Sequence, residues 1–172
     1  MEYFAQENIA KITGALDGEL KADHVMRSET IYTGRIVVMR SSGTPDILPL
    51  SVPGRLMDGF SGEGAVSLRA QIRSYSMREG EKNHLALTLF ARFIGDAAPD
   101  APDENEIGLA GTLAKKAVFR TTPFMREIAD MLVEVNRAFG RSDYIPCIAW
   151  GRDAHLAAEL EPGARIRLTG RM

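Results

Sequence analysis

The stretch Asp143-Tyr144-Ile145-Pro146-Cys147-Ile148-Ala149-Trp150-Gly151-Arg152-Asp153 has the alternation of a β-strand with a sharp end. One parity carries small to medium apolar residues suited to a tight interior: Ile145, Cys147 and Ala149. Tyr144 and Trp150 share the other parity, so a strand places both on one face. Gly151 predicts the end of the strand, and Asp153 is predicted to cap the helix that follows. Two aromatic rings on one face have two interpretations: a platform for stacked nucleobases, or ordinary packing against a neighbouring layer.

The composition limits the class of protein. With 45% apolar and 26% charged residues, the sequence is typical of a soluble globular protein. The formal net charge of −2 argues against a general polyanion binder, so any nucleic-acid site must be local. No run of about 18 apolar residues is present, so no membrane span is expected, and residues 1–6 do not resemble a secretory signal. The single cysteine, Cys147, excludes a disulfide framework and favours a reducing, cytoplasmic location.

Motifs for catalysis are missing from the sequence. His24, His84 and His155 do not have the spacing of metal ligands relative to Cys147. No phosphate-binding loop, Gly-x-Ser-x-Gly motif or dinucleotide fingerprint is found. The sequence therefore predicts a protein without catalytic activity, cofactor, metal or small-molecule substrate.

The sequence contains an internal repeat. Residues 7–16 align with residues 104–113, so that Glu104 stands against Glu7 at an offset of 97. Other identities at the same offset are Gly43 with Gly140, Asp46 with Asp143, Pro49 with Pro146, and Gly54-Arg55 with Gly151-Arg152. An asparagine, several glycines and a proline in phase over this length indicate a duplication.

The two copies are separated by a segment of different composition. Residues 95–104 are rich in Pro, Ala and Asp and lack large apolar side chains, which is typical of a linker. We therefore expect a first domain over residues 1–94, an acidic linker over 95–104, and a second domain over 105–172.

The first copy has the pattern of an all-β barrel. Apolar and β-branched alternation predicts five strands, with a short helical connection over 56–60 and a polar loop over 77–83. The predicted strands are 8–16, 30–39, 47–52, 65–76 and 84–93. Five strands with a short helix between the third and fourth fit the five-stranded Greek-key barrel known as the OB-fold.

The second copy follows the same order as far as the chain extends. Strands are predicted over 107–119, 127–137, 143–150 and 164–172, with a helix over 152–160. The first copy ends with a hairpin and a fifth strand, and the second copy has no counterpart of either. The expected fold is thus two tandem OB-folds, the second lacking its last strand, and we expect either a shortened molecule or a partner strand over the open edge.

Within the second copy, several motifs occur in a fixed order. They are Asn105 to Gly111, Phe119 to Pro123, Glu127 to Arg137, Ser142 to Pro146, Ala149 to Gly151, and Gly163 to Arg171. In this combination the chain resembles the bacterial single-stranded DNA-binding protein family, which includes the primosomal replication protein N type. The resemblance covers roughly 65 residues, and it reaches the first copy only through the duplication.

The resemblance implies stacking of bases on aromatic side chains at three positions: Phe139, Tyr144 and Trp150. Core, interface or loop packing remains the alternative for each. The candidates for binding phosphates are Lys115, Lys116, Arg120, Arg126, Arg137, Arg141, Arg152 and Arg171, and for each the alternative is a solvated charge. The chain departs from the family at Phe124-Met125, where the family usually has a glycine. Neither residue accepts positive φ easily, so the geometry of this turn is expected to differ.

The first copy lacks this aromatic platform. Ser42, Ile47 and Pro53 stand at the positions of Phe139, Tyr144 and Trp150. The resemblance therefore implies that the second copy binds while the first mainly supports assembly, and that two chains form a homodimer with four OB-folds.

The expected function is binding of single-stranded DNA without strong sequence preference, in replication, repair or recombination. The alternative is a protein–protein assembly module, since OB-folds host many functions.

Overall fold

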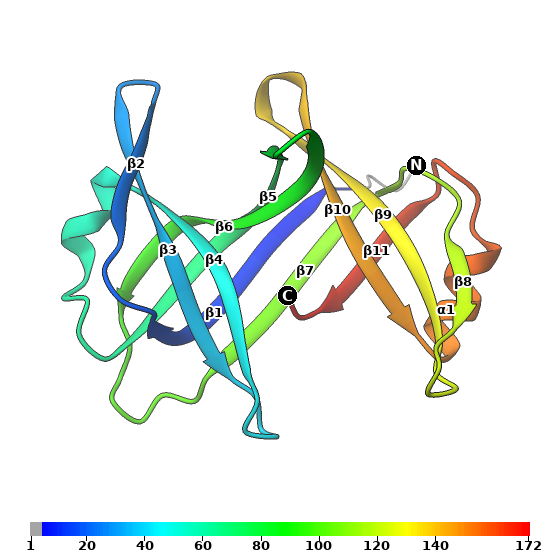
Figure 1. Cartoon of the computed structure of the whole chain (residues 1–172), viewed down its shortest axis with the longest axis horizontal. Helices are drawn as coiled ribbons and strands as arrows, with labels where there is room; N and C mark the ends of the chain where they lie inside the picture. The colour runs from blue at the N-terminus through cyan, green and yellow to red at the C-terminus, as the bar shows by residue number, and fades with distance from the viewer. Residues whose placement is uncertain (1–4) are drawn as a thin grey trace. The chain divides into compact units, whose positions relative to one another are not determined.

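The computed structural model describes residues 5–172, which fold mostly as strands (Figure 1). The chain divides into two compact units. The N-terminal unit comprises Ile9–Gly108 with Thr169–Met172, and the C-terminal unit comprises residues 5–8 with Leu109–Leu168. The two units follow the two sequence copies, with the last four residues counted in the N-terminal unit. Within residues 5–172, no helix is long and apolar enough to cross a membrane.

The N-terminal unit is a closed five-stranded barrel. Its elements are β1 (Glu7–Leu16), β2 (Lys21–Met26), β3 (Glu29–Met39), β4 (Pro45–Pro53), the 3₁₀ helix η1 (Gly54–Gly59), β5 (Ala65–Glu79) and β6 (Lys82–Asp96). Strand β1 pairs with both β3 and β5, β3 pairs with β4, and β5 pairs with β6. Parallel pairing of β4 with β6 closes the circle, and β2 extends β3. The predicted OB-fold is confirmed.

The C-terminal unit repeats most of this order. Its elements are β7 (Glu104–Leu113), β8 (Val118–Thr121), β9 (Glu127–Arg137), η2 (Ala138–Gly140), β10 (Arg141–Trp150), α1 (Arg152–Glu159) and β11 (Arg165–Gly170). Strand β9 pairs with β7, β8 and β10, and β11 pairs with β7. Among the described residues of this unit, no strand corresponds to β6.

The duplication extends to the register of the strands. Ala15 pairs with Val37 in one unit and Thr112 with Glu134 in the other, at the offset of 97 found in the sequence. A Cβ on Gly14 would lie 2.2 Å from the carbonyl oxygen of Val37, and one on Gly111 would lie 2.3 Å from that of Glu134. Glycine is therefore required where β1 closely approaches β3 and where β7 closely approaches β9.

Some predicted elements need correction. A hairpin does join β5 to β6, but its loop is shorter than the predicted 77–83, because the two strands stay paired as far as Glu79 and Lys82. The strand expected over 107–119 is interrupted, ending at Leu113 and resuming as β8 at Val118. Strand β2 was not predicted, since all six of its residues are exposed and show no apolar alternation.

The start of α1 also differs from the prediction. Gly151, with φ 54°, is the N-cap residue, and no side chain caps the helix. Asp153 lies in the first turn instead, where its negative charge is favourable near the N-terminal end of the helix dipole.

Strands reach into both ends of the segment predicted as a linker. Strand β6 continues to Asp96 and β7 begins at Glu104. Between them, the Asp103 carboxylate accepts a hydrogen bond of 2.5 Å from the backbone N–H of Met39.

Candidate nucleic-acid interface

One side of the β8–β9–β10 sheet carries the two strand aromatics. Tyr144 is 40% exposed and Trp150 is 52% exposed, and Pro146 and Ile148 between them are also exposed. We call these four residues the β10 face. The residues of opposite parity point inward, since Asp143 and Ile145 are buried. The predicted alternation of this strand is confirmed, and the indole of Trp150 is not sealed in the barrel.

The neighbouring strands extend this surface. Directly paired residues of antiparallel strands project to the same side. Glu134 pairs with Tyr144, and Asp130 pairs with both Ile148 and Val118. Val118 is exposed. The surface is therefore largely apolar, with two carboxylates and no excess of positive charge.

The helix α1 holds the other side of the sheet. Ala154 and Ala157 are its buried residues, and they form a small core with Ala117 and Ala129, against which Met131 and Ala149 pack. Small side chains let the helix approach the strands closely, as Figure 1 shows beside β8. This packing fixes the strand that carries the β10 face and leaves that face open.

Tyr144 is oriented by a polar contact on the same surface. Its hydroxyl donates to Oε1 of Glu134 at 3.4 Å, and the Ser142 hydroxyl donates to the same oxygen at 2.8 Å. A phenol anchored at its tip keeps the ring available along its length, which suits stacking.

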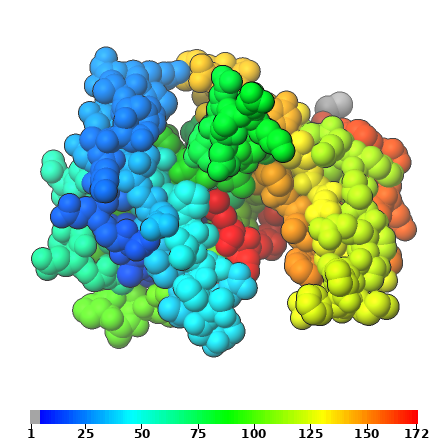
Figure 2. Space-filling model, in the orientation of Figure 1, coloured from blue at the N-terminus to red at the C-terminus, as the bar shows by residue number. Residues whose placement is uncertain are grey.

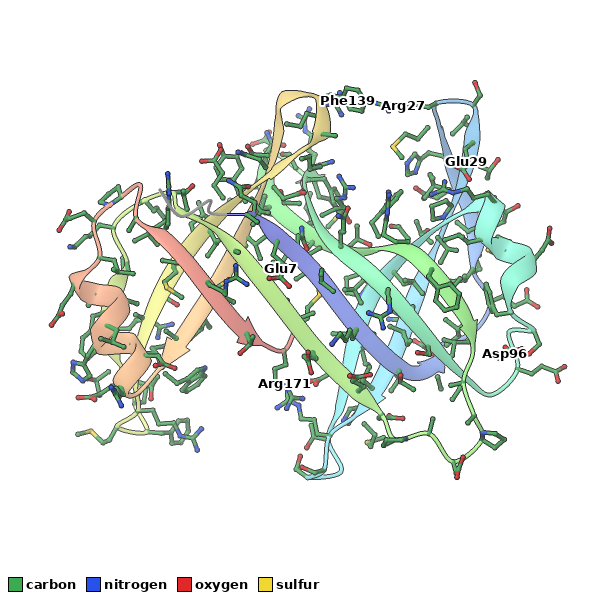
Figure 3. All side chains as sticks on the ribbon, turned by 180° about the vertical axis from the view of Figure 1, so that it is seen from behind. Glu7, Arg27, Glu29, Asp96, Phe139 and Arg171 are labelled. Carbon is green, nitrogen blue, oxygen red and sulfur yellow. The ribbon has the colours of Figure 1, made fainter. Side chains whose placement is uncertain are left out.

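Phe139 lies in the loop between β9 and β10, at the hairpin tip labelled in Figure 3. It is 82% exposed and has φ 65°, a left-handed conformation that a bulky residue rarely adopts. Gly140 follows with φ 67°. The loop thus presents an aromatic ring to solvent.

The basic candidates fall into two groups. Four lie against carboxylates: Lys116 on Glu161, Arg120 on Asp130, Arg137 on Asp143, and Arg171 on Asp46. The other four make no ion pair within residues 5–172: Lys115, Arg126, Arg141 and Arg152. Arg171 and its partner Asp46 both belong to the N-terminal unit.

Titratable groups near the interface show little sign of chemistry. The hydrogen bond from Arg120 lowers the pKa of Asp130. Burial raises the pKa of the Cys147 thiol to about 11, which leaves it protonated and unreactive at neutral pH. In the part of the chain that the structure describes, no group of three His, Cys, Asp or Glu residues could hold a metal ion.

Residues 104–172 match the model of the Single-strand binding protein family. The matched stretch makes up about two fifths of the chain. Single-stranded DNA-binding protein 3 of Streptococcus agalactiae is 35% identical over 75 residues, covering 40% of this chain and 54% of that protein. Single-stranded DNA-binding protein 2 of Streptococcus pyogenes is 35% identical over 75 residues, covering 40% and 46%. The chain thus spans about half the length of the curated relatives it matches.

Two solved structures share the fold over nearly the whole chain. The wild-type single-stranded DNA binding protein from Thermus aquaticus aligns with a TM-score of 0.79 at 20% identity, covering 96% of this chain and 84% of that chain. A deletion mutant of the same protein aligns with a TM-score of 0.73 at 19% identity, covering 96% and 86%. Together with the closed barrel of the N-terminal unit, they show two OB-folds in tandem.

The turn that departs from the family pattern keeps a glycine-like backbone. Met125 has φ 60°, and its N–H donates to the carbonyl of Thr122 at 2.9 Å. Phe124 and Met125 are both more than 80% exposed. Figure 2 shows this β8–β9 tip as the yellow projection at the lower right. Two large apolar side chains therefore occupy a solvent-facing turn.

The N-terminal unit offers a different surface at the equivalent positions. Ile47, at the position of Tyr144, is exposed, whereas Pro53, at the position of Trp150, is buried. A separate aromatic site lies on β5 and β6, where the Arg73 guanidinium stands 5.3 Å from the centre of the Phe90 ring. Tyr75 is exposed further along β5. The sequence alone does not place Phe90 beneath the Arg73 guanidinium, because this contact depends on the pairing of β5 with β6.

Proposed function

We propose that this protein binds single-stranded DNA without strong sequence preference, through base stacking on the β10 face and Phe139. The observation that carries the proposal is the strand β10 itself, which presents Tyr144 and Trp150 to solvent on one side. Any base has a π-face, so aromatic platforms bind strands of many sequences. The family model that residues 104–172 match and the names of the relatives support the same ligand.

Phosphate contacts would come from the basic side chains that are not already held by carboxylates. Lys115, Arg126, Arg141 and Arg152 are the candidates. Arg120 would have to leave Asp130, and Lys116 would have to leave Glu161, before either could contact a phosphate. Binding would therefore depend more on stacking than on charge.

Trp150 is the single tryptophan of the chain and reports on its own site. Titration with oligo(dT) at low salt should quench its fluorescence. Tyr144→Ala should weaken binding by about 5-fold to 150-fold, since stacking contributes about 1–3 kcal/mol per base. Leu156→Ala on α1 is the matched control, because Leu156 is as exposed as Trp150 but lies on the helix.

The absence of any quenching or anisotropy change at tens of micromolar strand would contradict the proposal. The rival interpretation, a protein–protein assembly module, would then be favoured. We also propose that the protein has no catalytic role. We propose the cytoplasm as its location, which the single cysteine favours.

We further propose that two chains form a homodimer with four OB-folds, the number that the family resemblance implies. Size-exclusion chromatography with light scattering should give about twice the mass of one chain at micromolar concentration. A monomer under those conditions would refute the dimer while leaving the binding proposal intact.

A further inference from the structure

Glu134 lies in the middle of the surface proposed to bind DNA. It pairs across the sheet with Tyr144, and its Oε1 accepts hydrogen bonds from the hydroxyls of Tyr144 and Ser142. This arrangement ties the carboxylate to the aromatic ring on which a base would stack. A base on Tyr144 would bring its polar edge within reach of the same carboxylate.

The negative charge of Glu134 is not balanced by an arginine, whereas that of the nearby Asp130 is. Asp130, on the same side of β9, accepts a 2.6 Å hydrogen bond from Arg120. Within residues 5–172, no cation forms an ion pair with Glu134. A carboxylate of this kind repels phosphates and offers only acceptors, so its favourable contacts are with donors.

Cytosine and thymine differ at the position such a group can read. Cytosine carries an exocyclic amino donor at C4, whereas thymine carries a carbonyl acceptor there, and Glu accepting from cytosine N4 is an established pairing. The N-terminal unit has no equivalent, because Val37 and Ile47 replace Glu134 and Tyr144 at the offset of 97.

We propose that Glu134 is a specificity-determining residue that shifts base preference from thymine toward cytosine at the Tyr144 position. The inference rests on the proposed function. The carboxylate accepts a hydrogen bond from the cytosine amino group and disfavours the thymine carbonyl. The resulting bias is modest, since a single position of the strand is read.

The test compares two oligonucleotides of equal length, oligo(dC) and oligo(dT), by fluorescence anisotropy with the full chain. Preferences that arise from stacking or backbone flexibility are common to all variants, so the informative quantity is the ratio of the two dissociation constants. Glu134→Gln keeps an acceptor for Tyr144 but adds an amide donor that suits thymine. We expect this change to shift the ratio toward oligo(dT) by roughly threefold to tenfold.

Glu159→Gln is the charge-matched control, because Glu159 is exposed on α1, which packs on the other side of the sheet. It should leave the ratio unchanged. Glu134→Ala is the second variant, for use if circular dichroism shows that Glu134→Gln folds poorly. It should shift the ratio of the dissociation constants in the same direction by a smaller factor.

Binding of both strands with an unchanged ratio in the Glu134 variants would overturn the inference and leave the proposed function standing. An equal shift in Glu159→Gln would also overturn it, since the effect would then be general charge. Failure of the unmodified protein to bind either strand would overturn the proposed function and this inference with it.

Discussion

The Nε atom of Arg137 lies 2.8 Å from Oδ2 of Asp143, a carboxylate whose side chain is fully buried. These two atoms attract electrostatically but are not aligned as a hydrogen bond. At the offset of 97, Arg40 and Asp46 form the same pair in the N-terminal unit. The pairs bracket the hairpin between β3 and β4 in one unit and between β9 and β10 in the other, so the duplication conserves an ion pair along with the register.

Replacing Asp143 should destabilise the C-terminal unit. Asp143→Ala removes the opposite charge from Arg137, whose side chain is only 26% exposed. Breaking a buried pair in this way costs about 3–5 kcal/mol, and the partial exposure of Arg137 favours the lower end. Urea denaturation followed by circular dichroism measures the loss. Asp100→Ala in the connecting segment is the control, and a loss below about 1 kcal/mol for Asp143→Ala would contradict the role assigned to the pair.

Asp46 should make the stability of the N-terminal unit depend on pH. Hydrogen bonds from Arg40, followed by those from Arg171, lower the pKa of this carboxyl, while burial opposes them. A group with a lowered folded pKa stabilises the protein above its unfolded pKa and loses that contribution as the pH falls further. Thermal midpoints should therefore fall from about pH 4 downward. Asp46→Asn should be less stable at neutral pH and show a flatter acid limb; an unchanged limb would contradict the assignment.

The barrel strands were predictable because the alternation that marks a half-buried strand is local in the sequence. Alternation located β3 to within one residue, and the repeated order of elements located its counterpart β9 at Glu127–Arg137, as the structure has it. Strand β2 escaped because both of its faces are solvated, so no apolar period marks it. The tip of the β5–β6 hairpin escaped for a related reason, since backbone pairing carries polar residues beyond the barrel as far as Glu79.

Met125→Gly should stabilise the C-terminal unit. Met125 holds φ 60° in the β8–β9 turn, a conformation that costs a residue with a Cβ about 1–2 kcal/mol and glycine little. A gain of about 1 kcal/mol in the free energy of unfolding is expected by urea denaturation. Phe124→Gly is the control, because Phe124 does not have positive φ and should gain nothing. Equal effects of the two changes would show that exposure, rather than backbone strain, dominates at this turn.

The shared face of Tyr144 and Trp150 followed from parity alone, and Phe139 followed from the family resemblance. The ion pairs of the basic residues could not be predicted in either way. Arg120 and Asp130 are ten residues apart and meet only because β8 and β9 pair. The pairing of Arg137 with Asp143 left a signal in the sequence, since Arg40 and Asp46 recur with the same spacing in the first copy. Partners that depend on register require the structure.

Gly111→Ala should disrupt the C-terminal unit. The new Cβ would lie 2.3 Å from the backbone oxygen of Glu134, which cannot move without shifting β9. Overpacking of this kind typically costs about 1–3 kcal/mol, and a clash with backbone belongs at the upper end. Gly170→Ala is the matched control, because nothing lies within 4 Å of its Cβ position and its φ is not positive. A loss of less than about 1 kcal/mol for Gly111→Ala would show that β7 can move away from β9 at this crossing.

The affinity for single-stranded DNA should depend only moderately on salt. Four of the eight basic candidates already lie against carboxylates, and Lys115, Arg126, Arg141 and Arg152 do not. Each phosphate contact on a single strand contributes about −0.7 to the slope of log K against log salt, so four contacts give about −3. Anisotropy titrations between low and physiological salt measure this slope, and Arg152→Gln should reduce its magnitude by about 0.7. A slope of about −6 or steeper would require the carboxylate-bound arginines and lysine to contact phosphates too, and would place charge ahead of stacking in this interface.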